Sequence, residues 1–307
     1  MPRRPGMLTK VSAAVPRSRT PWLTLAVAAL VALVVVTLSG RPGATHAPLT
    51  DAVPGDLRIA TWNMCDVRQW NCQDTGSSRQ KLQALKRLAT VDGAQVIMLQ
   101  EVCAGDLASA RKELGNGWRS TFRAYADRDA RGRQTKVRCA EQRQGQAGFA
   151  ILASSPLSHV SVVPSRQPAV GLRRGILCAS LASHGVRVCN AHLTLPGGDR
   201  AHPDWEYRDD QLSSLVGAAN ARTVFGGDLN SAPPSAGSQD SWIWPYDMYR
   251  SYRECDQDSA SSRSGRATHL TGHKVDYLFT ALPRTHCSVR ATAASDHLAL
   301  VMAVRAG

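Results

Sequence analysis

The sequence predicts an α/β protein built on mixed β-sheets. Two patterns support this class. A strand, an amphipathic helix and a second strand follow one another over residues 57–102, and two strands joined by a tight turn occupy residues 172–195. Helical crossovers connect parallel strands and tight turns connect antiparallel ones, so both kinds of pairing are expected. With 307 residues, 43 % of them apolar, the chain can bury a large core, as one big domain or two modest ones.

The first 50 residues have the composition of an export signal. They contain no acidic residue, and a basic stretch leads into the apolar segment 22–38 and then into Pro/Gly/Thr-rich sequence. Signal peptides and signal anchors share this order. We therefore expect residues 1–47 to be a signal peptide or a signal anchor and residues 48–55 to be a linker. Residues 56–307 are then secreted, or tethered to the outer face of the membrane by residues 22–38.

Eight cysteines form an even set, which suits four disulfides in an exported domain. The alternative is a set of buried free thiols. A turn at residues 183–185 places Cys178 opposite Cys189 or one diagonal step away, within reach of a disulfide. Order along the chain makes three further pairs plausible: Cys65 with Cys72, Cys103 with Cys139, and Cys255 with Cys287. No CxxC motif occurs, so a zinc ribbon or thioredoxin-like site has no support.

The first elements follow closely on one another. A strand is expected at 57–64 and a continuous apolar strand at 95–102. Between them, a helix over 77–94 begins at Ser77 or Ser78. Its apolar face consists of Leu82, Leu85, Leu88 and Ala89. A second helix, over 106–114 and ended by Gly115, precedes a strand at 118–126.

The remaining two thirds of the chain alternate loops, strands and one long helix. The polar, arginine-rich stretch 127–146 indicates a surface loop held by Cys139. A strand at 147–154, the 172–195 hairpin, a helix from 204 to about 222 and a strand ending in "VFGGD" follow. Two more strands are expected in "KVDYLFT" and "HLALVMAV". Without internal repeats or a second linker, one exported domain is the simplest division.

Polar residues stand at the ends of these apolar strands. They are Asn63, Glu101, His192, Asp228, Asn230, Asp276, Asp296 and His297. Each alone has an ordinary explanation, such as a turn cap or a surface pair. Together they indicate a site, because a layered α/β fold gathers its strand ends at one edge. Mg²⁺ prefers one or two carboxylates with water and substrate phosphate, which Glu101 with Asp228 or Asp296 could supply.

The order of the motifs "TWNM", "LQEV", "NAHL", "GGDLN", "VDYLF" and "SDHLAL" resembles the endonuclease/exonuclease/phosphatase superfamily, which includes pancreatic-type deoxyribonucleases. The similarity covers about residues 56–304. It implies a four-layered α/β sandwich in which helices flank two central mixed β-sheets. It also implies hydrolysis of a phosphate ester by in-line attack of water with Mg²⁺, or alternatively Mn²⁺ or Ca²⁺, as cofactor.

The resemblance implies a role for each matching residue. Glu101 is the principal metal ligand with Asn63 beside it, and Asp296 is a ligand at a possible second site. Asp228 and Asn230 position the water and the phosphate. His297 is the general base, oriented by Asp276, while His192 donates to the phosphate or protonates the leaving oxygen. Some family nucleases add a Glu or Tyr that partners the first histidine or touches the phosphate. Here the candidates are Tyr125, Asp127 and Asp129.

Charge favours nucleic acid as the substrate. Six of the 37 basic residues precede Ala47, which leaves 31 against 24 acidic residues, a surplus of seven in the exported part. Phosphate contacts are expected from Arg173, Arg174 and the arginine-rich loop, and from Tyr125 at the site. A generally solvated arginine-rich surface explains the surplus equally well. We expect a monomer.

Two alternatives stay open. The cluster of Trp242, Trp244, Tyr246 and Tyr249 suits a membrane interface, which would make the chain a phospholipid phosphodiesterase of the sphingomyelinase kind or a phosphoinositide or inositol phosphatase. Such aromatic residues also pack commonly against a core. The second alternative is a non-enzymatic module that binds with the same fold.

Overall fold

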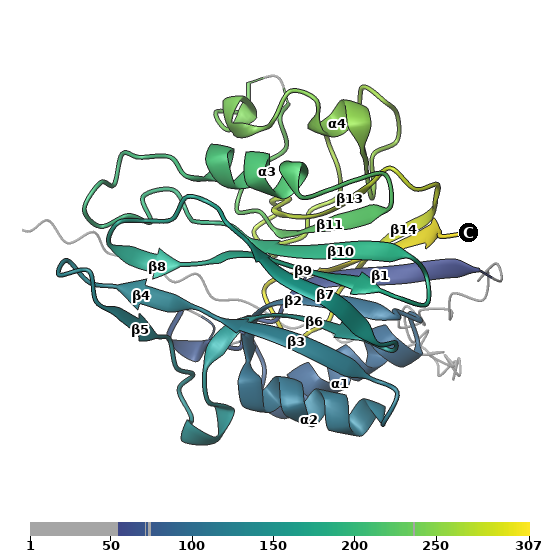
Figure 1. Ribbon diagram of the computed structural model, residues 1–307, viewed down its shortest axis with the longest axis horizontal. Helices are drawn as coiled ribbons and strands as arrows, with labels where there is room; N and C mark the ends of the chain where they lie inside the picture. The colour runs from purple at the N-terminus through teal and green to yellow at the C-terminus, as the bar shows by residue number, and fades with distance from the viewer. Residues whose placement is uncertain (1–54, 71, 73–74, 236) are drawn as a thin grey trace, which may run out of the picture. The chain divides into compact units, whose positions relative to one another are not determined.

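The computed structural model describes residues 55–307, apart from residues 71, 73, 74 and 236 (Figure 1). The expected signal segment 1–47 and all of the expected linker except Gly55 lie outside the described residues. The described part has two six-stranded mixed sheets with helices on their outer faces. The predicted α/β class with mixed sheets is confirmed. In the part of the chain that is described, no helix is both long and apolar enough to span a membrane.

The first sheet contains the β-α-β unit expected from the sequence. Its strand order is β14 (Arg284–Arg290), β15 (Ala299–Arg305), β1 (Asp56–Asn63), β2 (Val96–Cys103), β6 (Ala147–Ala153) and β3 (Arg119–Ala124). Strands β1 and β2 are parallel and α1 (Ser78–Thr90) connects them, whereas the other pairs are antiparallel. Strand β1 is buried along nearly its whole length, as a strand covered on both faces must be.

The second sheet has the matching plan. Its order is β12 (Arg253–Glu254), β13 (Asp276–Thr280), β11 (Thr223–Asp228), β10 (Val186–His192), β9 (Gly175–Leu181) and β7 (Leu157–Val163). Strands β10 and β11 are parallel, and the connection between them contains α3 (Arg208–Gly217). The predicted hairpin is formed by β9 and β10.

Three apolar clusters hold the layers together. One lies between the two sheets, with Ile59 and Met98 from the first facing Val188 and Leu278 from the second. A second joins the first sheet to α1 and α2 (Ala104–Leu114), and a third joins the second sheet to α3 and α4 (Met248–Ser251). Helix pairs therefore cover both outer faces of the sandwich.

The segment 127–146 differs from the surface loop that its composition indicates. Strands β4 (Ala126–Arg128) and β5 (Gln134–Lys136) form a hairpin that pairs with β8 (Gly171–Arg173) in a small third sheet. The Asp129 carboxylate closes the turn, because it accepts the backbone N–H groups of Arg131 and Arg133, both at 2.9 Å. Since β5 is exposed throughout, it carries no alternation of apolar and polar residues from which to predict it.

The predicted start of α1 agrees with the structure, whereas both predicted ends of α3 differ from it. Helix α1 begins after Ser77, which forms a capping box with Gln80, as expected. Helix α3 is shorter at both ends than the predicted 204–222. The Glu206 carboxylate already accepts the N–H groups of Tyr207 and Arg208 ahead of the first turn, and an Asn220 turn follows its end. Three single-turn 3₁₀ helices complete the described elements: η1 (Arg68–Trp70), η2 (Gln142–Gln144) and η3 (Ser241–Ile243).

All four disulfides join the cysteine pairs expected from the sequence, one from turn geometry and three from chain order. Cys178 and Cys189 lie directly opposite each other on β9 and β10, as the turn geometry predicted. The other three pairs are Cys65–Cys72, Cys103–Cys139 and Cys255–Cys287. The Cys103–Cys139 bond ties the segment after the small sheet to the end of β2.

A buried carboxylate fixes the loop that follows β10. Asp199 accepts the backbone N–H groups of Ala169 and Ala201 at 2.7 and 2.9 Å and the hydroxyl of Tyr207. Burial opposes the charge, but the hydrogen bonds of Tyr207 and the backbone outweigh it and hold the pKa of Asp199 below its usual range. The loop is thereby attached to the segment that leads into β8.

We expect Asp199→Asn to lower the free energy of unfolding at pH 7 by about 3 kcal/mol, because an amide N–H would face N–H donors. Since the folded-state pKa is lowered, the stabilisation is complete above the unfolded pKa of about 3.9 and is lost as the pH falls below it. Denaturant unfolding from pH 7 to pH 3 should show the two proteins converging. The exposed Asp210→Asn, which breaks a surface pair with Arg166, should cost about 1 kcal/mol or less. An equal loss in both variants would contradict the assignment.

Candidate active site

The ends of several strands bring the predicted polar residues together. In the first sheet, Asn63 at the end of β1 is the register partner of Gln100, next to Glu101. In the second sheet, Asp228 at the end of β11 is paired with His192 on one side and Asp276 on the other. Because the two sheets face each other, these ends form one edge of the sandwich.

The Asp228 carboxylate is the centre of the cluster. Its Oδ2 accepts a hydrogen bond from Asn63 Nδ2 at 3.0 Å and lies 3.4 Å from Nε2 of His192 and 4.0 Å from Nε2 of His297. Its Oδ1 accepts the backbone N–H of Asn230 at 3.0 Å. Asp228 is 2 % exposed. Residues more than 160 positions apart in the sequence therefore converge on one buried carboxylate.

Two glycines before Asp228 allow this close packing of strands. Gly226 and Gly227 both have positive φ, at 153° and 127°. A Cβ atom at Gly226 would overlap the carbonyl oxygen of Tyr277, and one at Gly227 would overlap that of Ala191. Only glycine fits at these two positions, because both the backbone angle and the space exclude a side chain.

His297 forms a buried pair with Asp276. Its Nδ1 lies 2.8 Å from Asp276 Oδ2, so Nδ1 carries the proton and Nε2 points toward Asp228. Burial disfavours the charged imidazole, but the Asp276 carboxylate outweighs it and raises the pKa of His297 to about 10. The ring is held further by its backbone, whose N–H donates to Ser295 and whose carbonyl accepts Trp62 Nε1–H.

His192 is oriented by Tyr125. The Tyr125 hydroxyl accepts the backbone N–H of Glu101 and lies 2.6 Å from Nδ1 of His192. The phenol therefore donates its own proton to Nδ1, which leaves the N–H of His192 at Nε2. That Nε2 is buried and has no hydrogen-bond partner among the described residues. Burial and the Arg174 charge hold the pKa of His192 well below its usual value, so the ring is neutral.

Tyr125 differs from its expected place in contact with substrate. Its side chain is fully buried, at 0 % exposure, so it stands behind His192. The two acidic candidates for this partner lie elsewhere: Asp127 pairs with Arg200 at 2.8 Å and Asp129 with Arg133 at 2.8 Å. The partner of His192 is thus a phenol and not a carboxylate.

Glu101 is a strained, uncompensated acid. Its φ is 49°, a conformation that non-glycine residues seldom adopt, and it lies where the β2–β6 register shifts. Burial raises the pKa of Glu101 to about 7, against the lowering influence of Arg174 and His297. His192, whose Nε2 is 4.0 Å from Oε1, is neutral and supplies no positive charge to the Glu101 carboxylate.

The donor set fits a hard divalent cation. Glu101, Asn63 and Asp228 place carboxylate and amide oxygens at one edge, and these are the ligand types that Mg²⁺ prefers. A buried carboxylate without a strong ion pair is expected where a cation completes the site. Glu101 and Asn63 would hold the ion, and the carboxylates of Asp228 and Asp296 would complement its charge.

Asp296 lies beside a histidine that sequence reasoning missed. His269 Nε2 is 3.3 Å from Asp296 Oδ2, and its ring is 4.7 Å from that of His297, edge to face. The two histidines are also joined by an isolated backbone bridge. The "THLTGHK" turn directly before Asp276 was the available signal, because it leads into a strand that carries a site residue.

A second missed feature connects the sheets beneath the site. Gln100 Nε2 donates to Thr61 and, at 2.6 Å, to Asn190 Oδ1, while Asn190 Nδ2 donates to the carbonyls of Leu99 and Ala150. Each amide comes one or two residues before a predicted site residue, in "LQEV" and "NAHL". This buried network fixes the two sheets in register where their polar ends meet.

The two predicted arginines have different surroundings. Arg174 donates to the Leu193 carbonyl at 2.9 Å. Its charge lowers the pKa of both Glu101 and His192, so it lies at the site. Arg173, on β8, lines a neighbouring cavity that it shares with Arg174. Asn230 turns its amide toward the same Leu193 carbonyl and has φ of 49°.

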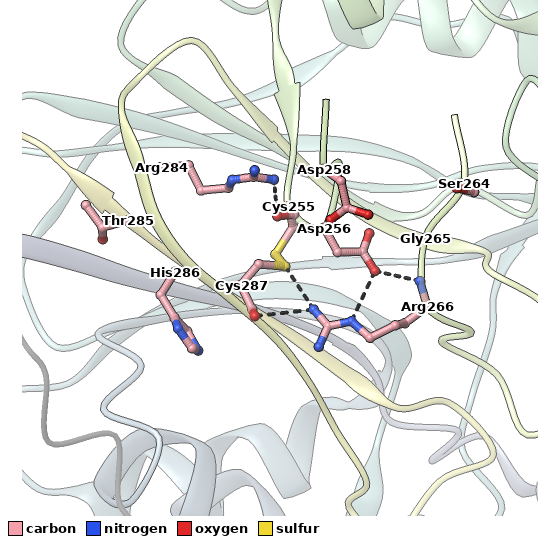
Figure 2. Close-up of a pocket in the computed structure, with 10 residues that line it drawn as sticks. All are labelled: Cys255, Asp256, Asp258, Ser264, Gly265, Arg266, Arg284, Thr285, His286 and Cys287. Atoms are coloured by element: carbon pink, nitrogen blue, oxygen red, sulfur yellow. Dashed lines mark hydrogen bonds and ion pairs between the residues drawn. A yellow bond between two sulfur atoms is a disulfide. The ribbon is translucent and has the colours of Figure 1, made fainter. Parts of the chain in front are cut away.

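Another cavity lies away from this cluster, at the Cys255–Cys287 disulfide (Figure 2). Its volume is about 640 Å³, but its cations are already engaged. Arg266 pairs with Asp256 at 3.4 Å, and Arg284 donates to backbone carbonyls, including that of Cys255. The cavity contains none of the predicted site residues.

The aromatic cluster divides into two pairs. Trp244 and Tyr249 pack against the outer face of the second sheet, at 6 % exposure each. Trp242 and Tyr246 are exposed, at 65 % and 82 %. The cluster is therefore half core and half surface, so each of the two explanations left open by the sequence applies to one pair.

The Cys65–Cys72 disulfide supports the edge that carries Asn63 and Glu101. The Cys65 N–H donates to Asn63 Oδ1 at 2.9 Å, and Cys72 Sγ lies 3.6 Å from Glu101 Oε2. Replacing both cysteines by alanine is expected to cost about 2–3 kcal/mol of unfolding free energy and to lower activity at a temperature where the variant stays folded. Thermal melts and rates at that temperature measure the two effects.

The matched control is the double alanine variant of Cys178 and Cys189, a bond of similar span on the outer face of the second sheet. It should lose similar stability and keep its turnover. If both variants retain full activity, the Cys65–Cys72 loop has no part in shaping the site.

Comparison with known proteins gives the class and then the family. Two facing mixed sheets that carry acidic residues and histidines at one edge are typical of an α/β-sandwich phosphoesterase. The model of the Endonuclease/Exonuclease/phosphatase family matches residues 61–297. The chain belongs to that family, whose members are hydrolases that act on phosphodiester bonds and are generally metal-dependent. No curated protein matches the chain.

Solved structures show the same fold at low sequence identity. The human Nocturnin catalytic domain with bound sulfate has 14 % identity and a TM-score of 0.54, over 81 % of this chain and 93 % of that one. A 3′-5′ exonuclease from Neisseria meningitidis has 16 % identity and a TM-score of 0.53, over 80 % and 98 %. D. rerio TDP2 complexed with a single-strand DNA product has 14 % identity and a TM-score of 0.53, over 81 % and 98 %.

Proposed function

We propose that the chain is a secreted, divalent-metal-dependent endonuclease that hydrolyses phosphodiester bonds of nucleic acid by in-line attack of water. The observation that carries the proposal is the convergence of Glu101, Asn63 and Asp228 with two histidines held in different protonation states. Four disulfides agree with an oxidising, extracellular location. The chain would act as a monomer.

Each side chain has a task in this reaction. The neutral form of His297, with its proton held on Nδ1 by Asp276, presents Nε2 to accept a proton from the attacking water. Because the pKa of His297 is raised to about 10, this form grows, and turnover should rise, as the pH increases above neutrality. Asp228, between the two imidazoles, orients that water. Neutral His192 directs its Nε2–H toward the Asp228 and Glu101 carboxylates, where it would donate to a phosphate oxygen as charge develops. Because the ring is neutral, donation of a hydrogen bond to the phosphate is favoured over protonation of the leaving oxygen.

Glu101 and Asn63 would hold the metal, with Mg²⁺ as the first choice and Mn²⁺ or Ca²⁺ as alternatives. When bound, the cation supplies charge neutralisation at the phosphate and its leaving oxygen. Asp296, paired with His269 at the rim, would bind a second ion. The carboxamide of Asn230 is fixed by Leu193 and would align the phosphate without adding negative charge.

The relatives' substrates support nucleic acid over lipid. One similar structure is described as an exonuclease and another as a complex with DNA. One observation favours the rival, a phospholipid phosphodiesterase or phosphoinositide phosphatase: the exposed rings of Trp242 and Tyr246. Aromatic rings of this kind insert at membrane interfaces.

A substrate panel separates these functions. Residues 48–307 are incubated with supercoiled plasmid, single-stranded RNA, sphingomyelin vesicles and phosphoinositide vesicles, with Mg²⁺ or with EDTA. We expect nicking of the plasmid that EDTA abolishes. Lipid hydrolysis with intact plasmid would support the rival and overturn the nuclease assignment, and no hydrolysis of any substrate would leave a binding module.

A further inference from the structure

A basic cavity adjoins the candidate active site. Its volume is about 210 Å³, and four cations line it: Arg123, Lys136, Arg173 and Arg174. None of its lining residues is acidic. Phe149 also lines the cavity. The other lining residues are polar or small apolar ones, several of them from residues 162–167. A concave surface of this charge suits an anion.

The small third sheet creates the cationic row. Lys136 on β5 and Arg173 on β8 are both register partners of Ala126 on the central strand β4. Directly opposite residues in an antiparallel sheet point to the same face, so the two cations flank a residue with a short side chain. The structure thus places two positive charges on either side of a shallow gap.

Three of these four charges have no ionic partner in the described part of the protein, and the fourth, Arg174, acts on Glu101 without a direct ion pair. Among the described residues, none of the four cations forms an ion pair, whereas nearby Arg133 and Arg200 pair with Asp129 and Asp127. The Nε atom of Arg174 is buried and has no hydrogen-bond partner in the described part. Arg123, Lys136 and Arg173, which form no ion pair in the described part, are therefore available to an external anion.

Two lining residues connect the cavity to the reacting centre. Arg174 lines the cavity and also acts electrostatically on Glu101 and His192. Gly175, another lining residue, is the register partner of His192 across β9 and β10. An anion in the cavity would therefore lie beside the phosphate that is being hydrolysed.

We propose that this cavity is a second phosphate subsite, which binds a phosphodiester flanking the scissile one in the same nucleic-acid strand. The inference rests on the proposed function and narrows it to polymeric substrates. A phospholipid with a single phosphate cannot occupy both places at once, whereas a polynucleotide carries a phosphate at every residue. Lys136 and Arg173 would determine the affinity for the nucleic-acid strand, and hydrolysis would take place at the neighbouring candidate active site.

The test uses Lys136→Ala/Arg173→Ala and a matched control, Arg111→Ala/Lys112→Ala, which removes the same two charges from α2. Binding of a fluorescent single-stranded oligonucleotide is measured in EDTA at several salt concentrations. For single strands, the slope of log K against log salt should become shallower by about 0.7 for each phosphate that is no longer neutralised. Because the subsite binds one phosphate, the first variant should change the slope by about 0.7, and the control should not change it. A slope equal to that of the wild type or the control would overturn the subsite.

Activity distinguishes this subsite from the catalytic assignment. Each protein is assayed with Mg²⁺ on the oligonucleotide and on bis(4-nitrophenyl) phosphate, which has one phosphate. The ratio of kcat/KM for the two substrates should fall about tenfold in Lys136→Ala/Arg173→Ala, through KM for the oligonucleotide. An unchanged ratio would overturn the subsite while hydrolysis by the wild type still supports the proposed function.

Two further outcomes are informative. If the wild type hydrolyses neither substrate, the proposed function fails and the subsite fails with it. If inorganic phosphate protects the cavity variant less than the wild type against heat, while oligonucleotide slopes agree, the cavity binds a free anion and the polymer subsite is overturned.

Discussion

His297→Ala is expected to lower phosphodiesterase turnover by about 10²- to 10⁴-fold, the range for loss of a general base. The imidazole is placed by Asp276 at 2.8 Å and faces the Asp228 carboxylate, so alanine would leave the water without a proton acceptor. The measurement is kcat on the best substrate of the panel, with a thermal melt to show that the variant is folded. The matched control is His184→Ala, at the turn of the β9–β10 hairpin and thus at the far end from His192.

Asp276→Asn tests the orientation of the same ring. The Asp276 carboxylate raises the pKa of His297, so its removal should lower that pKa and move the acid limb of the pH–rate profile to lower pH. Turnover should also fall, because an amide can stabilise the wrong tautomer of the ring. Near wild-type turnover in His297→Ala, or a profile unmoved in Asp276→Asn, would show that another group takes the proton.

Glu101→Gln is expected to remove metal-dependent activity. A bound cation supplies several kcal/mol of charge stabilisation to a phosphoryl reaction, so its loss corresponds to about 10³-fold or more in rate. Thermal melts in rising Mg²⁺ or Mn²⁺ provide a readout that does not depend on turnover. Wild type should gain about 2.7 kcal/mol at a concentration 100 times Kd, and Glu101→Gln should gain much less.

The metal-free proteins supply the control for folding. Burial raises the pKa of Glu101 to about 7, so the ionised carboxylate costs stability that grows as the pH rises from the unfolded value of about 4.3 through 7. In EDTA at pH 8, Glu101→Gln should therefore be at least as stable as the wild type. An equal metal-induced gain in both proteins would place the ion elsewhere.

Sequence patterns predicted the parts of the fold that depend on burial. Strands such as β2 and β15 are continuous apolar runs, and the turn at residues 183–185 fixed the partner of Cys178. Strands β7 and β14 were missed because exposed and half-buried residues alternate irregularly along them. The hairpin of β4 and β5 was missed for the same reason, and it depends on an Asp129 turn whose hydrogen bonds are local.

The sequence predicted those site residues that lie at the ends of strands. Asp228 and His192 are register partners, so their proximity follows from parallel pairing once the strands are known. Tyr125 could not be placed from the sequence, because its role depends on where the chain leaves β3 for the small sheet. His269 lies on a turn, where no periodicity indicates which way a side chain points.

The two glycines before Asp228 carry no functional group, but the "GGDLN" motif depends on them because the adjacent strands leave no space for a side chain. Even the smallest extra methyl group at Gly226 would collide with Tyr277 on the adjacent strand and wedge β11 away from it. The Asp228 carboxylate would then be displaced, even though every polar residue of the motif was unchanged. Loss of function in this fold can thus arise from a residue that touches neither water, ion nor phosphate, and a degenerate copy of the motif should be judged by its glycines as strictly as by its carboxylate.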